Sequence, residues 1–217
     1  MSDPTKDTTG ATDGAAPLVG VLALQGDVRE HAAVLRELGA NVVLVRRASE
    51  LAQVQALVIP GGESTTIDKL LRAFDLRDPL IAAIDAGLPV LGSCAGMVLL
   101  ARDIVSGIDG QQTLGGIPMT VRRNAFGRQV DSSEVELTWL PDGSSMQATF
   151  IRAPWVEQYD GDVEVLATVV DGAGEAHAVA VRYGNRIATS FHPEISGDHR
   201  VHQLLLDIVA ERSRHLP

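Results

Sequence analysis

Short apolar segments alternate with amphipathic ones over the first half of the chain, and this alternation constrains the fold more than any other feature of the sequence. Four apolar runs have the length of buried strands: residues 18–24, 41–45, 56–60 and 89–92. The segment that follows the first run carries apolar side chains at helical spacing, namely Val28, Ala32, Leu35 and Leu38. Strands that are apolar throughout are covered on both faces, so the pattern predicts an open, mostly parallel α/β sheet.

The ends of the predicted helices carry their own signals. In the first helix, over residues 27–39, Asp27 is the expected N-cap and Gly39 the expected C-terminal stop. In the next helix, Ser64 or Thr65 is the expected N-cap. We expect the remaining helices over residues 64–74, 77–87, 94–104 and 198–214.

The middle of the chain changes character. Between residues 116 and 170, apolar or alternating runs are separated by glycine and proline turns, which predicts strands over 117–123, 135–140, 148–154 and 163–170. Residues 177–194 then read as a hairpin that turns at Gly184 and Asn185. We expect these strands to form an antiparallel extension of the sheet.

Length and composition fit one globular domain. Of the 217 residues, 45% are hydrophobic and 21% charged, which predicts a single domain over residues 18–217. Residues 1–17 are small, polar and interrupted by glycine and proline, so we expect a disordered tail there. The tail lacks the basic and apolar regions of a secretory signal, and no apolar run approaches the length needed to span a bilayer.

Charge and cysteine content exclude further classes of protein. A net charge of −10 argues against a nucleic-acid partner, because phosphate binding requires an excess of lysine and arginine. The single cysteine, Cys94, cannot form an internal disulfide, and cysteine and histidine do not cluster as zinc ligands. We therefore expect no structural zinc site, and a reducing cytoplasm as the compartment.

Cys94 lies in the segment "GSCAG", between a predicted strand and a predicted helix. This is the form of a nucleophile elbow, in which flanking glycines let the chain turn tightly and leave the nucleophile at the end of the strand. At the start of a helix the thiolate would be favoured by unpaired amides, and the amide of Ala95 would face a developing oxyanion. Taken alone, the segment also fits a small, inert, buried cysteine.

A thiol nucleophile needs a base and a group that orients the base. His192 ends an apolar strand, and Glu194 lies two positions further on, so that in an extended chain both side chains point the same way. His192 is therefore the candidate base and Glu194 the group that holds its imidazole. An ordinary strand end followed by a turn is the alternative.

A third strand ends in "PGGEST", where Gly61 and Gly62 permit close approach of the backbone. An amide there would complete an oxyanion hole. A phosphate-binding loop is excluded, because the segment lacks the lysine of a P-loop and Glu63 would repel phosphate. Arginines in 122–129 and 150–155 suit either a substrate carboxylate or a charged surface loop.

Together these segments resemble the class I, or triad, glutamine amidotransferases, whose glutaminase domains use Cys, His and Glu in this chain order. Within that family the chain is most similar to the glutaminase subunits of pyridoxal 5'-phosphate synthases, to which "RNAFGRQ" and "FIRAP" are specific. The segments that carry the resemblance cover nearly all of residues 19–203: "LALQGDVREH", "IPGGESTTI", "GSCAGMVLLA", "RRNAFGRQVDS", "FIRAPW" and "SFHPEISGDHRVHQ".

The resemblance implies a flavodoxin-like three-layer α/β sandwich and a glutaminase without cofactor or metal. Cys94 would be the nucleophile, His192 the base and Glu194 its orienting group, with the oxyanion held by amides near Gly62 and Ala95. The residues that would bind L-glutamine are Gly62, Glu63, Ser64, Arg123, Ile151 and Arg152. Ammonia would pass to a separate synthase subunit that makes pyridoxal 5'-phosphate, and we expect the face with Gln25 and Gly26 to contribute to docking.

Two other functions stay open at this point. A cysteine hydrolase or peptidase of related fold would cleave peptides rather than glutamine, although it does not explain "GGES" and "HPE" together. A non-catalytic regulatory subunit would show no thiol-dependent turnover, although the candidate triad argues against it.

Overall fold

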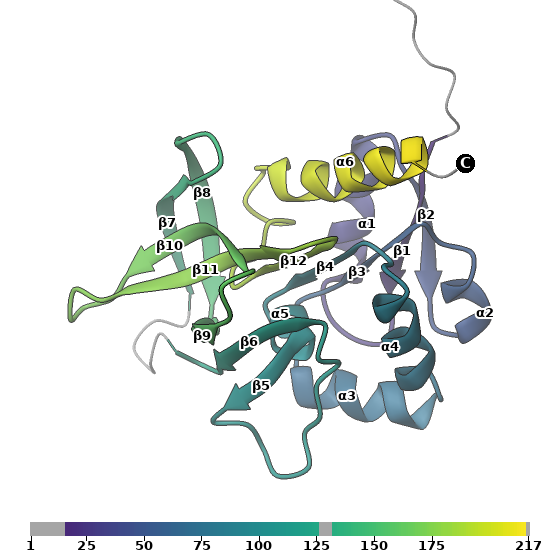
Figure 1. Cartoon of the computed structure of the whole chain (residues 1–217), viewed down its shortest axis with the longest axis horizontal. Coiled ribbons are helices and arrows are strands. Elements are labelled where there is room, and N and C mark those ends of the chain that lie inside the picture. Colours follow the sequence, from purple (N-terminus) through teal and green to yellow (C-terminus); the bar gives the residue numbers. More distant parts are fainter. Residues whose placement is uncertain (1–15, 126–131, 216–217) are drawn as a thin grey trace, which may run out of the picture.

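The molecule is described by a computed structural model, which covers residues 16–125 and 132–215 (Figure 1). The helices are α1 Val28–Glu37, α2 Ala48–Leu51, α3 Ser64–Ala73, α4 Arg77–Asp85, α5 Ala95–Leu100 and α6 Arg200–His215. The strands are β1 Leu18–Leu22, β2 Asn41–Val45, β3 Ala56–Ile59, β4 Val90–Ser93, β5 Ala101–Val105, β6 Ile117–Arg122, β7 Ser132–Trp139, β8 Ser144–Ile151, β9 Trp155–Tyr159, β10 Glu164–Val170, β11 Ala176–Tyr183 and β12 Arg186–Thr189.

The main sheet has ten strands in the spatial order β2-β1-β3-β4-β12-β11-β9-β6-β5, with β10 paired to β11. The five neighbours from β2 to β12 are parallel, whereas β11 pairs antiparallel with β12, β9 and β10. β7 and β8 form a separate antiparallel pair. The predicted α/β fold, mostly parallel with an antiparallel extension, is confirmed.

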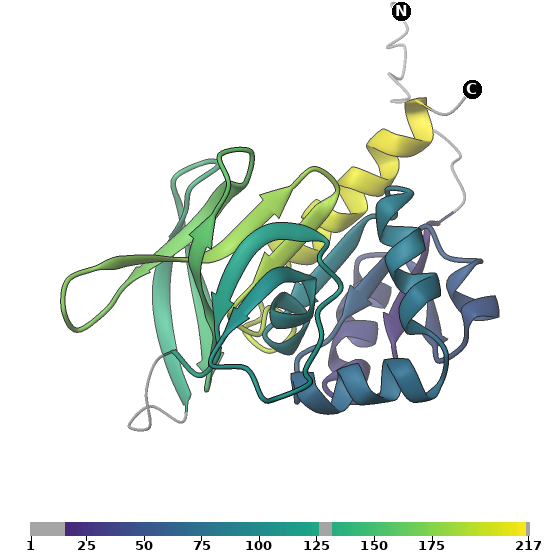
Figure 2. The ribbon, with the colours of Figure 1, turned by 60° about the horizontal axis from the view of Figure 1, so that its bottom comes forward.

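Helices cover both faces of the parallel strands, which makes three layers (Figures 1 and 2). The side chains of β3 show the division, because all four are fully buried and alternate between two cores. Ala56 and Val58 pack in the core that α1 and α6 cover, and Leu57 and Ile59 pack against α3, α4 and α5. The strand is therefore apolar throughout because neither face meets water.

The structure corrects one helix boundary of the sequence prediction and adds one strand to it. The helix expected over residues 94–104 ends at Leu100, and Ala101 begins β5, which pairs with β6. The apolar run from Ala95 to Leu100 is buried on all sides, so nothing in its pattern marks where the helix stops. The sequence does not predict β9, because Trp155 falls in a segment with the pattern of a charged loop.

The helix caps agree in part with the prediction. Gly39 follows α1 with a φ of 86°, in the left-handed region that favours glycine, and it ends the helix as expected. The cap of α3 is neither Ser64 nor Thr65 but Glu63, whose carboxylate accepts from the backbone N–H of Thr66. Asp27 precedes α1 but makes no side-chain cap, because its carboxylate turns toward the site described below.

The N-terminal prediction falls mostly outside the described residues. Of the expected tail, only Ala16 and Pro17 are described, and their carbonyl oxygens accept hydrogen bonds from Asn41. None of the described helices combines the length and the apolar character that crossing a membrane requires.

A substitution at Gly96 tests how tightly α5 packs on β3. A Cβ at Gly96 would lie 2.2 Å from the carbonyl oxygen of Ile59, so Gly96→Ala must push the helix away from the strand. We expect it to lower the free energy of unfolding by about 1–3 kcal/mol or more, although alanine normally stabilises a helix relative to glycine. Denaturant unfolding measures the change.

Gly161→Ala is the matched control, because a Cβ there meets nothing within 4 Å. We expect a change within about 0.5 kcal/mol. Equal stability of the Gly96→Ala and Gly161→Ala proteins would contradict the packing described here.

Candidate active site

Cys94 sits at the turn between β4 and α5, with a φ of 46° and a ψ of −98°. Few L-residues adopt this conformation, and it is held here by neighbouring contacts. The backbone N–H of Cys94 donates to the carbonyl oxygen of Thr189 at 2.8 Å, and Gly92 packs closely on the backbone of Gly96. The predicted elbow is therefore present, and the side chain is left at the carboxyl end of β4.

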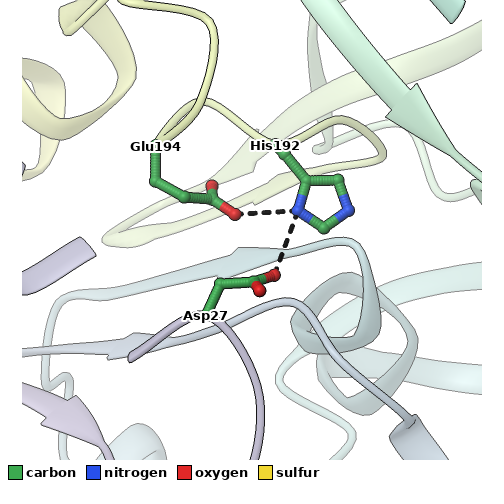
Figure 3. Close-up of side chains that lie close together, drawn as sticks. All are labelled: Asp27, His192 and Glu194. Carbon is green, nitrogen blue, oxygen red and sulfur yellow. Dashed lines mark hydrogen bonds and ion pairs between the residues drawn. The ribbon is translucent and has the colours of Figure 1, made fainter. Parts of the chain in front are cut away.

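His192 follows β12, the strand that pairs with β4, and Thr189 lies opposite Ser93 in their register. The N–H of His192 donates to the carbonyl oxygen of Thr149 in β8, which fixes its backbone. The ring nitrogen Nδ1 lies 2.8 Å from Oε1 of Glu194 and 3.3 Å from Oδ2 of Asp27 (Figure 3). Both carboxylates therefore contact the same ring nitrogen of His192.

The second ring nitrogen, Nε2, points away from Glu194 and Asp27 (Figure 3). Burial lowers the pKa of His192, but hydrogen bonds to Asp27, Cys94 and Glu194 outweigh burial and raise this pKa well above its usual range. Burial raises the pKa of Glu194, and the charge of His192 opposes that rise. The site thus favours an imidazolium next to the sulfur of Cys94, which is the partner that a nucleophilic thiolate needs.

A cavity of about 410 Å³ opens in front of Cys94. It lies at the carboxyl ends of β1, β3, β4 and β12, where ligands bind in open α/β sheets. Its lining contains every site residue predicted from the sequence except Glu194, which lies behind His192. The lining residues are Gln25, Asp27, Gly62, Glu63, Ser64, Cys94, Ala95, Val98, Arg123, Asn124, Ile151, Arg152, Pro154 and His192.

Backbone strain gathers around this cavity. Five described residues other than glycine have a positive φ, and three of them line the cavity: Cys94, Asn124 and Arg152. The N–H of Ala125 donates to the carbonyl oxygen of Ala153, which ties the two strained loops together. Strained backbone of this kind persists where the surrounding structure holds functional groups in place.

Glu63 and Arg123 form an ion pair of 2.8 Å on the wall of the cavity. Burial raises the pKa of Glu63, but hydrogen bonds from Thr66 and Thr65 and the charge of Arg123 lower it further than burial raises it. The side chain of Arg123 is only 13% exposed, so the interpretation of this arginine as an ordinary surface charge is wrong. A carboxylate–guanidinium pair suits a ligand that carries both an ammonium and a carboxylate group.

The sequence does not mark every residue of the site. Gln111 bonds to both Arg123, at 2.8 Å, and Ser64, at 3.0 Å, and Gln25 accepts from the N–H of Glu63. Asp27 has the sequence signal of a helix cap alone, although it follows a buried strand just as Glu63 and Cys94 do. Of the segment 122–129, the structure describes residues 122–125, since residues 126–131 lie outside the described part of the chain. Within it, Arg122 pairs with Glu157 on the surface.

The described residues contain two clusters with the ligand types and spacing of a metal site. One is Asp27, His192 and Glu194, whose ligand atoms already hydrogen-bond to one another. The other lies in the β10–β11 turn, where the carboxylate of Asp171 accepts from backbone amides and pairs with His177. In both clusters the close approach is accounted for by hydrogen bonds within the protein, and the absence of a metal stays a prediction.

Residues 21–211 match the model of the SNO glutamine amidotransferase family. The chain belongs to this family. Among its relatives, a pyridoxal 5'-phosphate synthase subunit PdxT from Parafrankia sp. is 60% identical over 195 residues, which cover 89% of this chain and 94% of the relative. The protein of the same name from Nocardia farcinica is 57% identical over 96% of this chain and 92% of the relative.

Solved structures agree with this membership of the glutamine amidotransferase family. A crystal structure of a glutamine amidotransferase superposes with a TM-score of 0.81 and 44% identity, covering 88% of this chain and 98% of that one. The structure of PurLQS from Thermotoga maritima has a TM-score of 0.66 at 16% identity, over 89% of this chain and 99% of that one, and shares the fold alone.

Replacement of Asp27 tests the electrostatics of the imidazole. Asp27→Asn removes one of the two carboxylates at Nδ1, so we expect the pKa of His192 to fall toward its ordinary value of 6.5. NMR titration of the labelled imidazoles measures it. Asp162→Asn, which removes the same charge from an exposed turn, should leave that pKa unchanged. An unchanged pKa in Asp27→Asn would contradict the assignment.

Proposed function

We propose that the protein hydrolyses L-glutamine to L-glutamate and ammonia, as the glutaminase subunit of a pyridoxal 5'-phosphate synthase in vitamin B6 biosynthesis. The observation that carries the proposal is the placement of Cys94, on a strained turn, beside an imidazole that two carboxylates hold. Membership of the glutamine amidotransferase family and the shared name of its relatives support the substrate and the pathway.

The reaction begins at the amide carbon of the glutamine side chain. The Sγ thiolate of Cys94 attacks this carbon, and the carbonyl oxygen becomes an oxyanion that the amides of Gly62 and Ala95 stabilise. Nε2 of His192 donates its proton to the departing nitrogen, and ammonia leaves a γ-glutamyl thioester on Cys94. The neutral imidazole then takes a proton from water, which attacks the thioester and releases glutamate.

Each triad residue has one task in this scheme. Glu194 keeps Nδ1 of His192 protonated, so that Nε2 is the nitrogen that exchanges protons with substrate and water. Glutamine is held by the predicted binding residues Gly62, Glu63, Ser64, Arg123, Ile151 and Arg152, all of which line the cavity. Within this set, Glu63 attracts the α-ammonium group of the substrate and Arg123 attracts its α-carboxylate.

The proposal includes a partner. Ammonia passes to a synthase subunit that makes pyridoxal 5'-phosphate, because free ammonia is protonated in water and lost as a nucleophile. We place the docking surface on the face with Gln25 and Gly26, beside the cavity. Residues 18–217 act as one glutaminase domain in the cytoplasm.

Replacement of the nucleophile tests the proposal. In the complex with the synthase subunit, Cys94→Ala should reduce glutamate release from glutamine by about 10³-fold or more, because no other group takes the covalent step. Copurification with the synthase subunit shows that the variant still folds and docks. Unchanged glutamate release would refute the proposal, and thiol-dependent cleavage of peptides but not of glutamine would favour a cysteine peptidase.

A further inference from the structure

Two histidines with no task in the proposed reaction lie buried behind the site. His31 belongs to α1 and His202 to α6, the two helices that cover the same face of the sheet, and both side chains are fully buried (Figure 1). Their rings meet, with Nδ1 of His31 2.8 Å from Nε2 of His202. A buried pair of this kind needs a reason, because polar groups cost free energy when they leave water.

The other nitrogen of His31 reaches the candidate triad. Its Nε2 lies 2.9 Å from Oγ of Ser93, the residue before Cys94, and 3.3 Å from Oε2 of Glu194. The contact with Glu194 is the longer and less well directed of the two, yet among the described residues Oε2 has no hydrogen bond of good geometry. His31 is therefore the donor next to the one carboxylate oxygen that His192 leaves unused.

The contacts determine which nitrogens carry protons. Burial lowers the pKa of His31, as do His202 and His192, and burial and His199 lower the pKa of His202 to about 4. Both rings are therefore neutral, and each has one N–H. A bare Nε2 on His31 would face the carboxylate of Glu194 and be repelled, so Nε2 carries the proton and Nδ1 accepts.

His202 fits the same assignment. Its Nε2 must donate to Nδ1 of His31, which leaves Nδ1 of His202 without a proton. That atom is buried and has no hydrogen-bond partner within the described part of the chain. The opposite tautomers would bury an unpaired N–H there, and they would also turn a lone pair toward Glu194.

We propose that His31 is a positioning residue that holds Glu194 in place, and that His202 keeps His31 in the tautomer that does so. His202 donates to His31, and the N–H of His31 faces Oε2 of Glu194, whose Oε1 accepts from Nδ1 of His192. Oγ of Ser93 accepts from the same N–H, so the imidazole of His31 contacts both the elbow and the carboxylate of Glu194. This inference rests on the proposed triad and adds a link from the triad to helices α1 and α6.

Two amide replacements of His31 separate its two contacts. The amide of glutamine occupies the place of Nε2, so His31→Gln keeps a donor for Glu194 and Ser93. The amide of asparagine occupies the place of Nδ1, so His31→Asn keeps the contact with His202 and loses the one with Glu194. Both variants remove the imidazole and retain a polar side chain, which makes each the control for the other.

In the complex with the synthase subunit, we expect His31→Asn to lower kcat by about 10- to 100-fold, because it removes the one N–H donor beside the charged oxygen Oε2 of Glu194. His31→Gln should stay within a few-fold of the unmodified protein. The KM for glutamine should be similar in both, because His31 does not line the cavity. Equal kcat values for the two variants, after correction for the folded fraction, would overturn the proposal.

Alkylation of Cys94 by iodoacetamide gives a second readout, which does not depend on glutamine as substrate. Cys94 is the only cysteine, so its alkylation rate reports how well the imidazole supports the thiolate. We expect slower alkylation in His31→Asn than in His31→Gln, and equal rates would contradict the proposal. If the two His31 variants are alkylated at the same rate while Cys94→Ala still abolishes glutaminase activity, the role of His31 is refuted and the proposed function stands.

If the His31 variants do not fold, substitutions on α6 make the same test. His202→Gln retains a donor toward His31, whereas His202→Leu removes it and leaves the tautomer of His31 unfixed. We expect His202→Leu to slow the alkylation of Cys94 more than His202→Gln does. Equal alkylation rates in these two variants would overturn the role of His202.

Discussion

The backbone at Cys94 is the constraint on which the site depends. Its φ of 46° and ψ of −98° cost an L-residue of the order of 1–3 kcal/mol, which the surrounding structure must offset. Gly96 offsets it by packing on the carbonyl of Ile59, and Thr189 by accepting the amide of Cys94. Because α5 is held this close to β3, the chain turns abruptly after β4. The sulfur then stays at the edge of the sheet instead of entering a core.

The groups proposed to act on Cys94 come from other parts of the fold. His192 comes from the end of β12, and its orientation depends on two carboxylates, Glu194 and Asp27. Glu194 in turn contacts His31, so the core on the side of α1 and α6 is polar behind the proposed triad. Buried polar groups are tolerated when they bond to one another, and such a network then fixes one arrangement of its members. The proposed chemistry is thereby linked to the packing of the two helices.

The sequence predicted those features that a local pattern marks. Cys94 and His192 each follow an apolar run that ends a strand, so a strand-end rule finds them, whereas the binding role of Glu63 is implied by the family resemblance alone. His31 and His202 lie 171 residues apart on amphipathic helices, and no local pattern distinguishes them from ordinary core positions. The end of α5 was missed for a related reason, because β5 begins without a turn residue. These features depend on contacts between elements that lie far apart in the sequence, and a local pattern does not show such contacts.

The central claim is that Cys94 forms a covalent intermediate with glutamine. The most direct measurement is mass spectrometry of the synthase complex, stopped with acid during turnover of glutamine. We expect a γ-glutamyl adduct on the peptide that contains Cys94, and less of it in His192→Asn, where the thiolate loses its imidazolium partner and the departing nitrogen receives no proton. An adduct on a different residue, or turnover with no adduct on Cys94 in either protein, would contradict the account.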